Sequence, residues 1–186
     1  MKFENLYRPI DVFILLAVFF LLPVKPSFSE ERPPLPVVTT LPFLKDFVEQ
    51  IGQNRVSVST LLTGMESEHT YTPKPSDILS VKNAQVLVQV GLGLEIWVKG
   101  LIENAGNANL LIITASHGIP LIREEGKDAE EDHHDHEGGN PHIWLDPENA
   151  KTMVREITEG LIQKDPAGKE FYLKNQGVYL TKLDLL

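Results

Sequence analysis

Residues 37–62 read VVTTLPFLKDFVEQIGQNRVSVSTLL and predict a strand, a helix and a second strand in that order. The β-branched run at 37–40 is typical of a strand. Apolar residues then recur at helical spacing between Pro42 and Gly52, two residue types that favour the start and the end of a helix. Residues 56–62 alternate apolar with small polar side chains, as a second strand does. Two strands joined through a helix indicate a parallel pair.

The rest of the chain repeats this alternation. A helix capped by Ser76 is expected to lead into a strand at 86–90, and a helix at 94–105 into a strand at 110–114. Strands that alternate with helices favour right-handed crossovers. The sequence therefore predicts an α/β fold, a parallel four-stranded sheet with helices on both faces. In such sheets ligands bind outside the carboxyl ends of the strands.

Two further helices are expected at the end of the chain. Asp-Pro-Glu at 146–148 is a strong signal for the start of a helix. Asp-Pro at 165–166 predicts the start of another helix in the same way. A single apolar stripe then runs to the last residue. Because no helix cap follows this stripe, it predicts that the chain is truncated and that the surface on which the stripe packs is missing. The alternative is a C-terminal helix that packs on this same domain. The members of the stripe are Tyr172, Tyr179, Leu183 and Leu186.

The first 29 residues predict a cleaved export signal. Residues 12–22 are eleven consecutive apolar residues. That run is too short for a membrane span, which needs about 20, but it is typical of a signal-peptide core. Lys2 and Arg8 precede it, and the small residues around Ser29 fit a cleavage site. An uncleaved anchor is the alternative. Because no lipobox cysteine is present, a periplasmic location is expected.

Composition excludes several classes of function. The 186 residues carry 17 Lys and Arg against 26 Asp and Glu, a net charge of −9. Nucleic-acid binders normally carry the opposite excess, so no nucleic-acid partner is expected. The absence of cysteine excludes disulfide scaffolds, thiolate zinc fingers and thiol nucleophiles. A transition-metal site in this chain must therefore use His, Asp or Glu.

Three of the six histidines lie in an acidic segment. Residues 123–137 hold eight acidic and two basic residues, which accounts for −6 of the net charge, and His133, His134 and His136 lie among them. Imidazole beside carboxylate is good ligand chemistry for a divalent transition metal. We expect this His/acid-rich loop, residues 123–139, to be an auxiliary metal-binding loop of low affinity, because ordering it costs entropy. The alternative is a solvated linker.

His69 and His142 are candidates for a tighter site. His69 is expected at the ligand-binding edge of the sheet, and Pro73 and Pro75 stiffen the chain after it. His142 follows a proline and precedes an apolar anchor and a capped helix. Ligands that are placed beforehand lose little entropy on binding, so both histidines are suited to hold a metal. The alternative for both is ordinary polar surface.

Three other features receive simpler interpretations. His117 follows the fourth predicted strand, and it is a weaker metal candidate or a plain loop histidine. Gly-Leu-Gly at 91–93 resembles a phosphate loop, but no Lys-Ser or Lys-Thr follows, so a turn out of a strand is expected. Trp97 and Trp144 are expected to be packing residues.

Two longer motifs resemble a known family. Residues 68–77, EHTYTPKPSD, resemble the first metal-ligand motif of the zinc and manganese solute-binding proteins of bacterial ABC importers, and residues 140–147, NPHIWLDP, resemble the second. Residues 91–95, GLGLE, shortly before Trp97, also resemble that family. The His/acid-rich loop is similar to one that marks its zinc subgroup, the ZnuA-like proteins. The resemblance covers about residues 37–186, with the motifs in the family's order.

The resemblance implies two α/β lobes joined by a long helix, with one metal in the cleft between them. His69 and His142 would be the ligands from the first lobe, and Glu68 would supply an oxygen unless water takes its place. The family's remaining ligands come from the second lobe, and this sequence has no histidine after His142. Residues 30–146 would then be the metal-binding lobe, and residues 147–186 would be helices that lead to a missing second lobe.

The resemblance further implies a monomeric extracytoplasmic carrier that captures Zn²⁺ and delivers it to the membrane permease of an ABC importer. Zinc is favoured over manganese because the ligands are rich in nitrogen. A manganese- or iron-binding homologue and a surface adhesin are the alternatives within the family. An enzyme is not expected, because a zinc hydrolase needs an open metal position with a general base, and no His-Glu-x-x-His is present.

Overall fold

The computed structural model describes residues 32–120 and 140–185. Within the compact unit Pro33–Leu186, four strands form one parallel sheet in the order β2-β1-β3-β4. Each strand is joined to the next through a helix, so the expected parallel α/β sheet is confirmed. The strands are β1 (Leu35–Thr39), β2 (Val56–Thr60), β3 (Val86–Gln89) and β4 (Leu111–Thr114).

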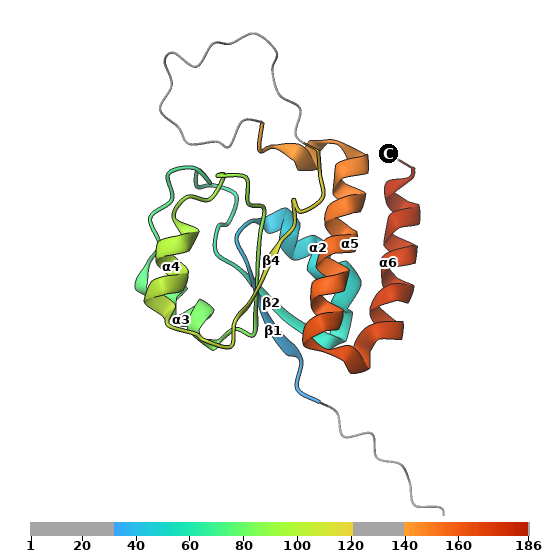
Figure 1. Ribbon diagram of the computed structural model, residues 1–186, viewed down its shortest axis with the longest axis horizontal. Helices are drawn as coiled ribbons and strands as arrows, with labels where there is room; N and C mark the ends of the chain where they lie inside the picture. The colour runs from blue at the N-terminus through green and yellow to red at the C-terminus, as the bar shows by residue number, and fades with distance from the viewer. Residues whose placement is uncertain (1–31, 121–139, 186) are drawn as a thin grey trace, which may run out of the picture. The chain divides into compact units, whose positions relative to one another are not determined.

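Helices cover both faces of the sheet, as predicted (Figure 1). On one face lie α3 (Pro75–Asn83) and α4 (Val98–Ala105), which pack against each other. On the other face lie α2 (Pro42–Gly52) and α5 (Pro147–Lys164), and α6 (Lys169–Leu183) packs on both of them. The result is a three-layered arrangement with the sheet in the middle.

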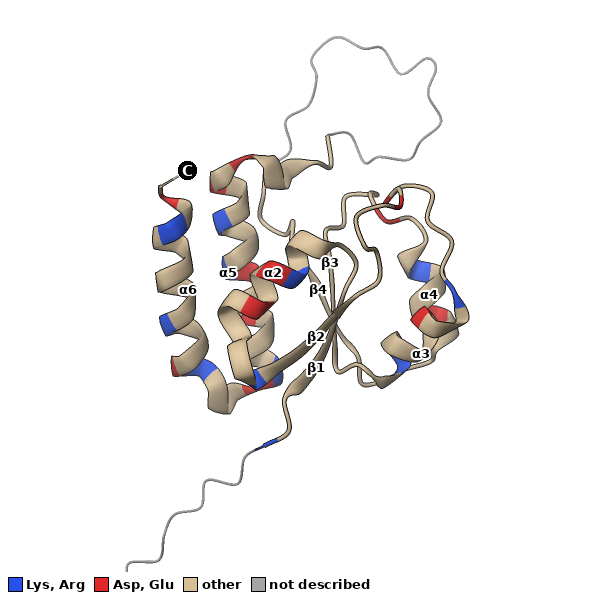
Figure 2. Ribbon diagram, turned by 180° about the vertical axis from the view of Figure 1, so that it is seen from behind, with Lys and Arg blue, Asp and Glu red and all other residues tan. Residues whose placement is uncertain are grey.

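The strands carry no charged residue, because the sheet is covered on both faces. Val86, Leu87 and Val88 of β3 are completely buried. Charged residues lie on the helices and loops instead (Figure 2). The apolar positions along one side of α5 are buried in the core. These positions are Ala150, Met153, Val154, Ile157 and Leu161.

The start of α3 differs from the prediction. The helix begins at Pro75 and not after a cap at Ser76. Lys74 is the residue before the helix, and its backbone N–H donates to the Asp77 carboxylate at 2.7 Å. The cap is therefore made by an acid in the first turn that reaches back to the start of the helix, which is one half of a capping box.

Asp165 and Pro166 do begin a helical segment ahead of α6, as predicted, but the side chain of Asp165 does not cap it as that of Asp146 caps α5. The short 3-10 helix η4 (Pro166–Gly168) has no side-chain cap. The Asp165 carboxylate instead accepts hydrogen bonds from Arg55 Nη2 at 2.6 Å and from the Tyr172 hydroxyl at 2.8 Å. These contacts join η4 and α6 to the segment before β2. The local sequence does not reveal them, because Arg55 lies 110 residues earlier in the chain.

The helix α6 packs on this domain. Of the stripe that was predicted to lack a partner, Tyr172 is completely buried and Leu183 is 8% exposed. The Tyr179 hydroxyl donates to Asp46 of α2 at 2.7 Å. Leu186 lies outside the described residues. The prediction that the stripe had lost its packing partner was therefore wrong, because α2 and α5 supply that partner.

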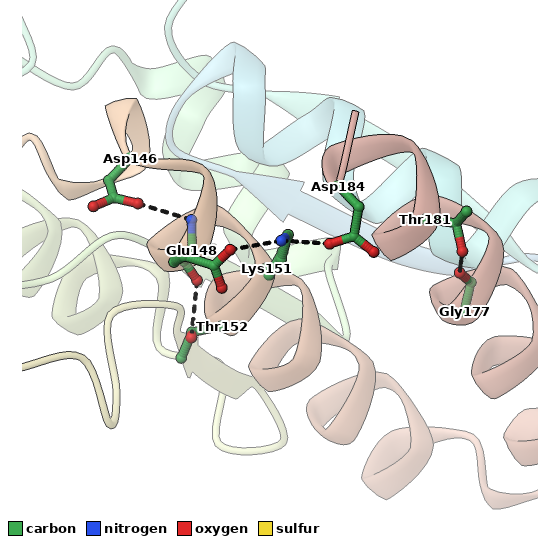
Figure 3. A network of polar contacts seen from close by, with 7 residues as sticks. All are labelled: Asp146, Glu148, Lys151, Thr152, Gly177, Thr181 and Asp184. Carbon is green, nitrogen blue, oxygen red and sulfur yellow. Dashed lines mark hydrogen bonds and ion pairs between the residues drawn. The ribbon is translucent and has the colours of Figure 1, made fainter. Parts of the chain in front are cut away.

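A buried lysine joins the start of α5 to the end of α6 (Figure 3). Lys151 Nζ lies 2.7 Å from Glu148 Oε1 and 2.5 Å from Asp184 Oδ1. Hydrogen bonds to Asp184 and then to Glu148 raise the pKa of Lys151. Asp146 caps α5 as predicted, since its carboxylate accepts the Glu148 N–H at 2.8 Å. The segment that precedes α5 is thereby attached to the start of this helix, which Lys151 in turn joins to the end of α6.

Some of the predicted organisation lies outside the described residues. The export signal at 1–29 and the His/acid-rich loop at 123–139 are among the residues without a described placement. No helix within residues 32–120 and 140–185 is both long enough and apolar enough to span a bilayer. The division of the chain at residue 146 stays a prediction.

The tyrosines predict how the fold responds to alkali. Burial, followed by hydrogen bonds to carboxylates, raises the pKa of Tyr71 and of Tyr172 to about 12 and also raises the pKa of Tyr179. In the unfolded chain tyrosines ionise near pH 10, so the folded state holds these protons longer. The stability contributed by the three groups is expected to be complete below about pH 10 and to be lost as the pH rises towards about 12. Denaturant unfolding across this range measures the loss. Phenolate absorbance of all three groups in the native protein near pH 10 would contradict it.

Candidate metal centre

The candidate site lies at the carboxyl ends of the strands. Glu68 and His69 belong to the loop between β2 and α3. His142 lies directly before the 3-10 helix η3 (Ile143–Leu145), which leads into α5. These segments are far apart along the chain. They meet because parallel strands all deliver the segments that follow them to the same edge of the sheet.

Glu68, His69 and His142 form a compact group of metal-ligating side chains, the one group of three or more that residues 32–120 and 140–185 contain. Their ligand atoms all lie within 4.8 Å of one another. Glu68 Oε1 is 3.8 Å from His69 Nε2 and 3.8 Å from His142 Nδ1. The two imidazole rings lie edge to face with centroids 5.5 Å apart. All three residues predicted as ligands are thus brought together, with the carboxylate near both rings.

The spacing suits a single divalent ion after a small movement. Two atoms that bind one tetrahedral zinc ion lie about 3.3 Å apart, because Zn–N and Zn–O bonds are about 2.0–2.1 Å long. The two separations of 3.8 Å from Glu68 Oε1 exceed this by about half an ångström, and the ligand nitrogens of His69 and His142 lie within 4.8 Å of each other. The side chains of Glu68, His69 and His142 are 25%, 36% and 33% exposed. An ion can therefore reach them from solvent.

Aromatic packing holds the segment that carries His142. The backbone N–H of His142 donates to the side-chain oxygen of Asn140 at 3.0 Å, and its ring centroid lies 5.1 Å from that of Trp144. Trp144 in turn stacks on Phe43 of α2, with centroids 4.6 Å apart and planes inclined by 20°. Trp144 is a packing residue, as predicted, and the residue that it helps to place is a candidate ligand.

Two other aromatic side chains hold the loop that carries Glu68 and His69. Trp97 Nε1 donates to the backbone oxygen of Glu68 at 2.7 Å. Tyr71 is 8% exposed, and its hydroxyl donates to Asp77 Oδ2 at 2.8 Å. The rings of Tyr71 and Trp97 meet edge to face with centroids 5.0 Å apart. The packing role predicted for Trp97 is confirmed, but its hydrogen bond to the ligand-bearing loop was missed.

A buried carboxylate joins the ends of β1 and β3. Glu95 is 6% exposed, and its Oε1 accepts from the Thr40 hydroxyl at 2.7 Å and from the Val90 N–H at 2.8 Å. Its Oε2 accepts from the Gly91 N–H at 2.9 Å. Burial raises the pKa of Glu95, although the three donors act in the opposite direction. Sequence reasoning missed this residue, and the available signal was an acid in an apolar run directly after a strand.

The turn after β3 explains why α4 begins at Val98 and not at the predicted residue 94. Residues 91–93 all have positive φ, which no helix accommodates. A Cβ at Gly91 would lie 2.5 Å from Thr114 Cγ2, so glycine is required there by both conformation and space. The interpretation as a structural turn instead of a phosphate loop is supported, because the Gly91 N–H already donates within the protein.

Among the described residues, one further histidine, His117, lies apart from this group. His117 Nδ1 is 3.4 Å from Glu156 Oε1 of α5, and its side chain is 78% exposed. It is not a member of the metal-ligating group. His133, His134 and His136 of the predicted auxiliary loop lie outside the described residues, so their role stays a prediction.

Comparison with known protein families agrees with this geometry. The family model for ZnuA, described as zinc-uptake complex component A periplasmic, matches residues 37–186. The chain belongs to the ZnuA family. The resemblance inferred from residues 68–77 and 140–147 is therefore confirmed. The family description is that of an uptake component, and relatives such as PsaA of Streptococcus pneumoniae are named as ABC transporter substrate-binding lipoproteins, so the expectation that the chain is not an enzyme is confirmed at the level of the family.

Individual relatives bind different metals. Manganese-binding lipoprotein MntA of Halalkalibacterium halodurans is 34% identical over 159 residues, 85% of this chain and 49% of MntA. High-affinity zinc uptake system protein ZnuA of Bacillus subtilis is 31% identical over 190 residues, 98% of this chain and 58% of that protein. A crystal structure of ZnuA matches with a TM-score of 0.71 at 30% identity, over 81% of this chain and 55% of that one. The chain thus spans about half the length of these ZnuA-family relatives.

The contacts of Glu95 predict the effect of Glu95→Gln. Glutamine keeps one acceptor oxygen but turns the other into an NH₂ donor, which then faces a hydroxyl or N–H donor at the ends of β1 and β3. Loss of a hydrogen bond to a buried charged group is expected to lower the free energy of unfolding by about 2 kcal/mol. Urea denaturation measures this change.

The matched control is Glu103→Gln on α4, where the side chain is exposed. This variant should change the free energy of unfolding by less than about 0.5 kcal/mol. Equal stability of Glu95→Gln and the wild-type protein would show that the second carboxylate oxygen contributes nothing that an amide cannot replace.

Proposed function

We propose that this member of the ZnuA family captures Zn²⁺ outside the cytoplasm and delivers it to the membrane permease of an ABC importer. The observation that carries the proposal is the convergence of Glu68, His69 and His142 at the carboxyl edge of the sheet. A carrier needs ligands that are held in place and still reachable. The backbone around each of these residues is held by packing and hydrogen bonds, and their side chains are partly exposed.

The proposed cargo is zinc because two of the three ligands are imidazoles. Nitrogen ligands suit Zn²⁺, whereas Mn²⁺ prefers carboxylate and other oxygen ligands. The description of the family as a zinc-uptake component supports the same choice. A manganese carrier is the second candidate, because Glu68 supplies an oxygen and because the chain is 34% identical to manganese-binding MntA.

The proposed site is open on one side. A tetrahedral zinc ion takes four ligands, and Glu68, His69 and His142 supply three. One position remains for water or for a further protein ligand. In the two-lobe arrangement that we propose, residues 30–146 form the first lobe, and residues 147–186 lead towards a second lobe that supplies this ligand.

We further propose a periplasmic monomer whose residues 1–29 act as a cleaved export signal. The family description names the periplasm, and the MntA relative is named as a lipoprotein, so both place members outside the cytoplasm. The loop histidines His133, His134 and His136 are proposed as an auxiliary, weaker metal-binding group.

Replacement of His69 or His142 by alanine tests the proposed site. Each change removes one of three ligands, so we expect the zinc affinity to fall by a factor of about 100 or more, a loss larger than that from a residue that merely supports a ligand. Equilibrium dialysis of the chain with Zn²⁺ measures the affinity. The same measurement with Mn²⁺ ranks the two candidate metals.

The control for this experiment is His117→Ala. His117 is exposed and lies outside the metal-ligating group, so its removal should leave the zinc affinity unchanged. Deletion of residues 123–139 in all variants removes the second group of histidines. Unchanged zinc binding by a protein that lacks this loop and carries alanine at both 69 and 142 would end the proposal.

The proposal also predicts a dependence of affinity on pH. Imidazole binds a metal only in its neutral form, so protons compete with Zn²⁺ for the two histidine ligands. The affinity is expected to be highest near pH 8 and to fall steeply below about pH 6. Dialysis at a series of pH values measures the profile. A flat profile between about pH 8 and 5 would indicate ligation by carboxylates alone.

A further inference from the structure

The loop that carries Glu68 and His69 has no regular structure of its own. It runs from the end of β2 to the start of α3 without a helix or a strand. An irregular loop has many accessible conformations, and binding a metal requires most of them to be given up. The affinity of the site therefore depends on what holds this loop before the metal arrives.

Two contacts hold the loop on either side of His69. Before it, the backbone oxygen of Glu68 accepts a hydrogen bond of 2.7 Å from Trp97 Nε1. After it, the buried Tyr71 packs edge to face on the same Trp97 ring and donates to Asp77. One indole side chain thus contacts the loop at residues 68 and 71, with the candidate ligand between these two points.

Trp97 is itself firmly placed. It lies at the residue before α4, and the Val98 N–H donates to the Glu95 backbone oxygen at 3.0 Å, so residues 95–98 form one hydrogen-bonded turn. The Glu95 side chain is fixed by its three hydrogen bonds to Thr40, Val90 and Gly91. The Glu95 side chain therefore ties this turn to the sheet, and the Trp97 indole ties the same turn to the backbone of Glu68.

We propose that Trp97 is a positioning residue for the metal site and that it acts through its indole N–H on the Glu68–His69 segment. This inference rests on the proposed metal-binding function. If Trp97 served packing alone, an aromatic ring without the N–H would retain most of its effect on the metal site. The hydrogen bond is the feature that links Trp97 to the ligands, because its acceptor belongs to one ligand and is adjacent to the other.

The substitution Trp97→Phe separates these two roles. It keeps an aromatic ring against Tyr71 and removes the donor to Glu68. Zinc affinity, measured by equilibrium dialysis well below the unfolding temperature, is expected to fall by a factor of about two to ten, which is the usual worth of one hydrogen bond. The visible absorption spectrum of the Co²⁺-loaded protein, which reports the arrangement of the ligands, should change as well.

Tyr172→Phe is the matched control. It also removes one hydrogen bond made by a buried aromatic side chain, here to Asp165, and that contact lies near the start of β2, at the opposite edge of the sheet. This variant is expected to lower the unfolding temperature while the zinc affinity and the Co²⁺ spectrum stay as in the wild type. Loss of affinity in both variants to the same degree would mean that general stability is responsible, and would overturn the inference.

A measurement on the wild-type protein covers the case in which Trp97→Phe does not fold. Coupling between two equilibria is reciprocal, so a hydrogen bond that strengthens zinc binding must itself be strengthened by zinc. The chain has two tryptophans, which give two indole N–H signals in NMR spectra. Exchange of the Trp97 indole proton with solvent is expected to slow by a factor of about two to ten on saturation with zinc.

The outcomes distinguish this inference from the proposed function. If the wild-type protein binds no zinc, both fail. If it binds zinc, and Trp97→Phe binds it equally well or the exchange of the Trp97 indole proton is unaffected by zinc, the positioning role alone fails.

Discussion

The carboxylate of Glu95 is the interaction on which the site-bearing edge of the molecule depends. It accepts hydrogen bonds from the ends of two neighbouring strands, at Thr40 after β1 and at Val90 and Gly91 after β3. Strand ends carry backbone donors that the sheet no longer pairs, and leaving them unpaired in a buried place is costly. One acidic side chain satisfies three donors there. The same turn places Trp97, and the hydrogen bond from Trp97 to the Glu68 backbone then holds the loop that carries Glu68.

Local patterns in the sequence were sufficient for the order of strands and helices and for the parallel sheet. The β-branched runs and the helical spacing of Leu44, Phe47, Val48 and Ile51 depend on which faces are buried, and burial leaves a periodic trace in the sequence. The candidate ligands could also be predicted from the sequence, because proline and a helix cap mark stiff backbone around His69 and His142. Contacts between distant residues left no such trace. The pairing of Asp165 with Arg55 and the hydrogen bond of Trp97 to Glu68 are fixed by the completed fold alone.

The ligand group shows how an α/β sheet builds a site from segments that are remote in sequence. The loop after β2 supplies a carboxylate and an imidazole, and the segment before α5 supplies the second imidazole. Each segment is braced by a different helix: α4 begins next to Trp97, and α2 contributes Phe43 beneath Trp144. The two halves of the group are therefore supported from opposite faces of the sheet.

The placement of the two indoles has an optical consequence. The chain contains no tryptophan other than Trp97 and Trp144, and each touches a different half of the ligand group. Almost all of the ultraviolet emission of the protein therefore originates within a few ångströms of the candidate site. Changes at the candidate site can therefore be followed by intrinsic tryptophan fluorescence, without an attached dye. The rest of the fold contributes almost nothing to this signal.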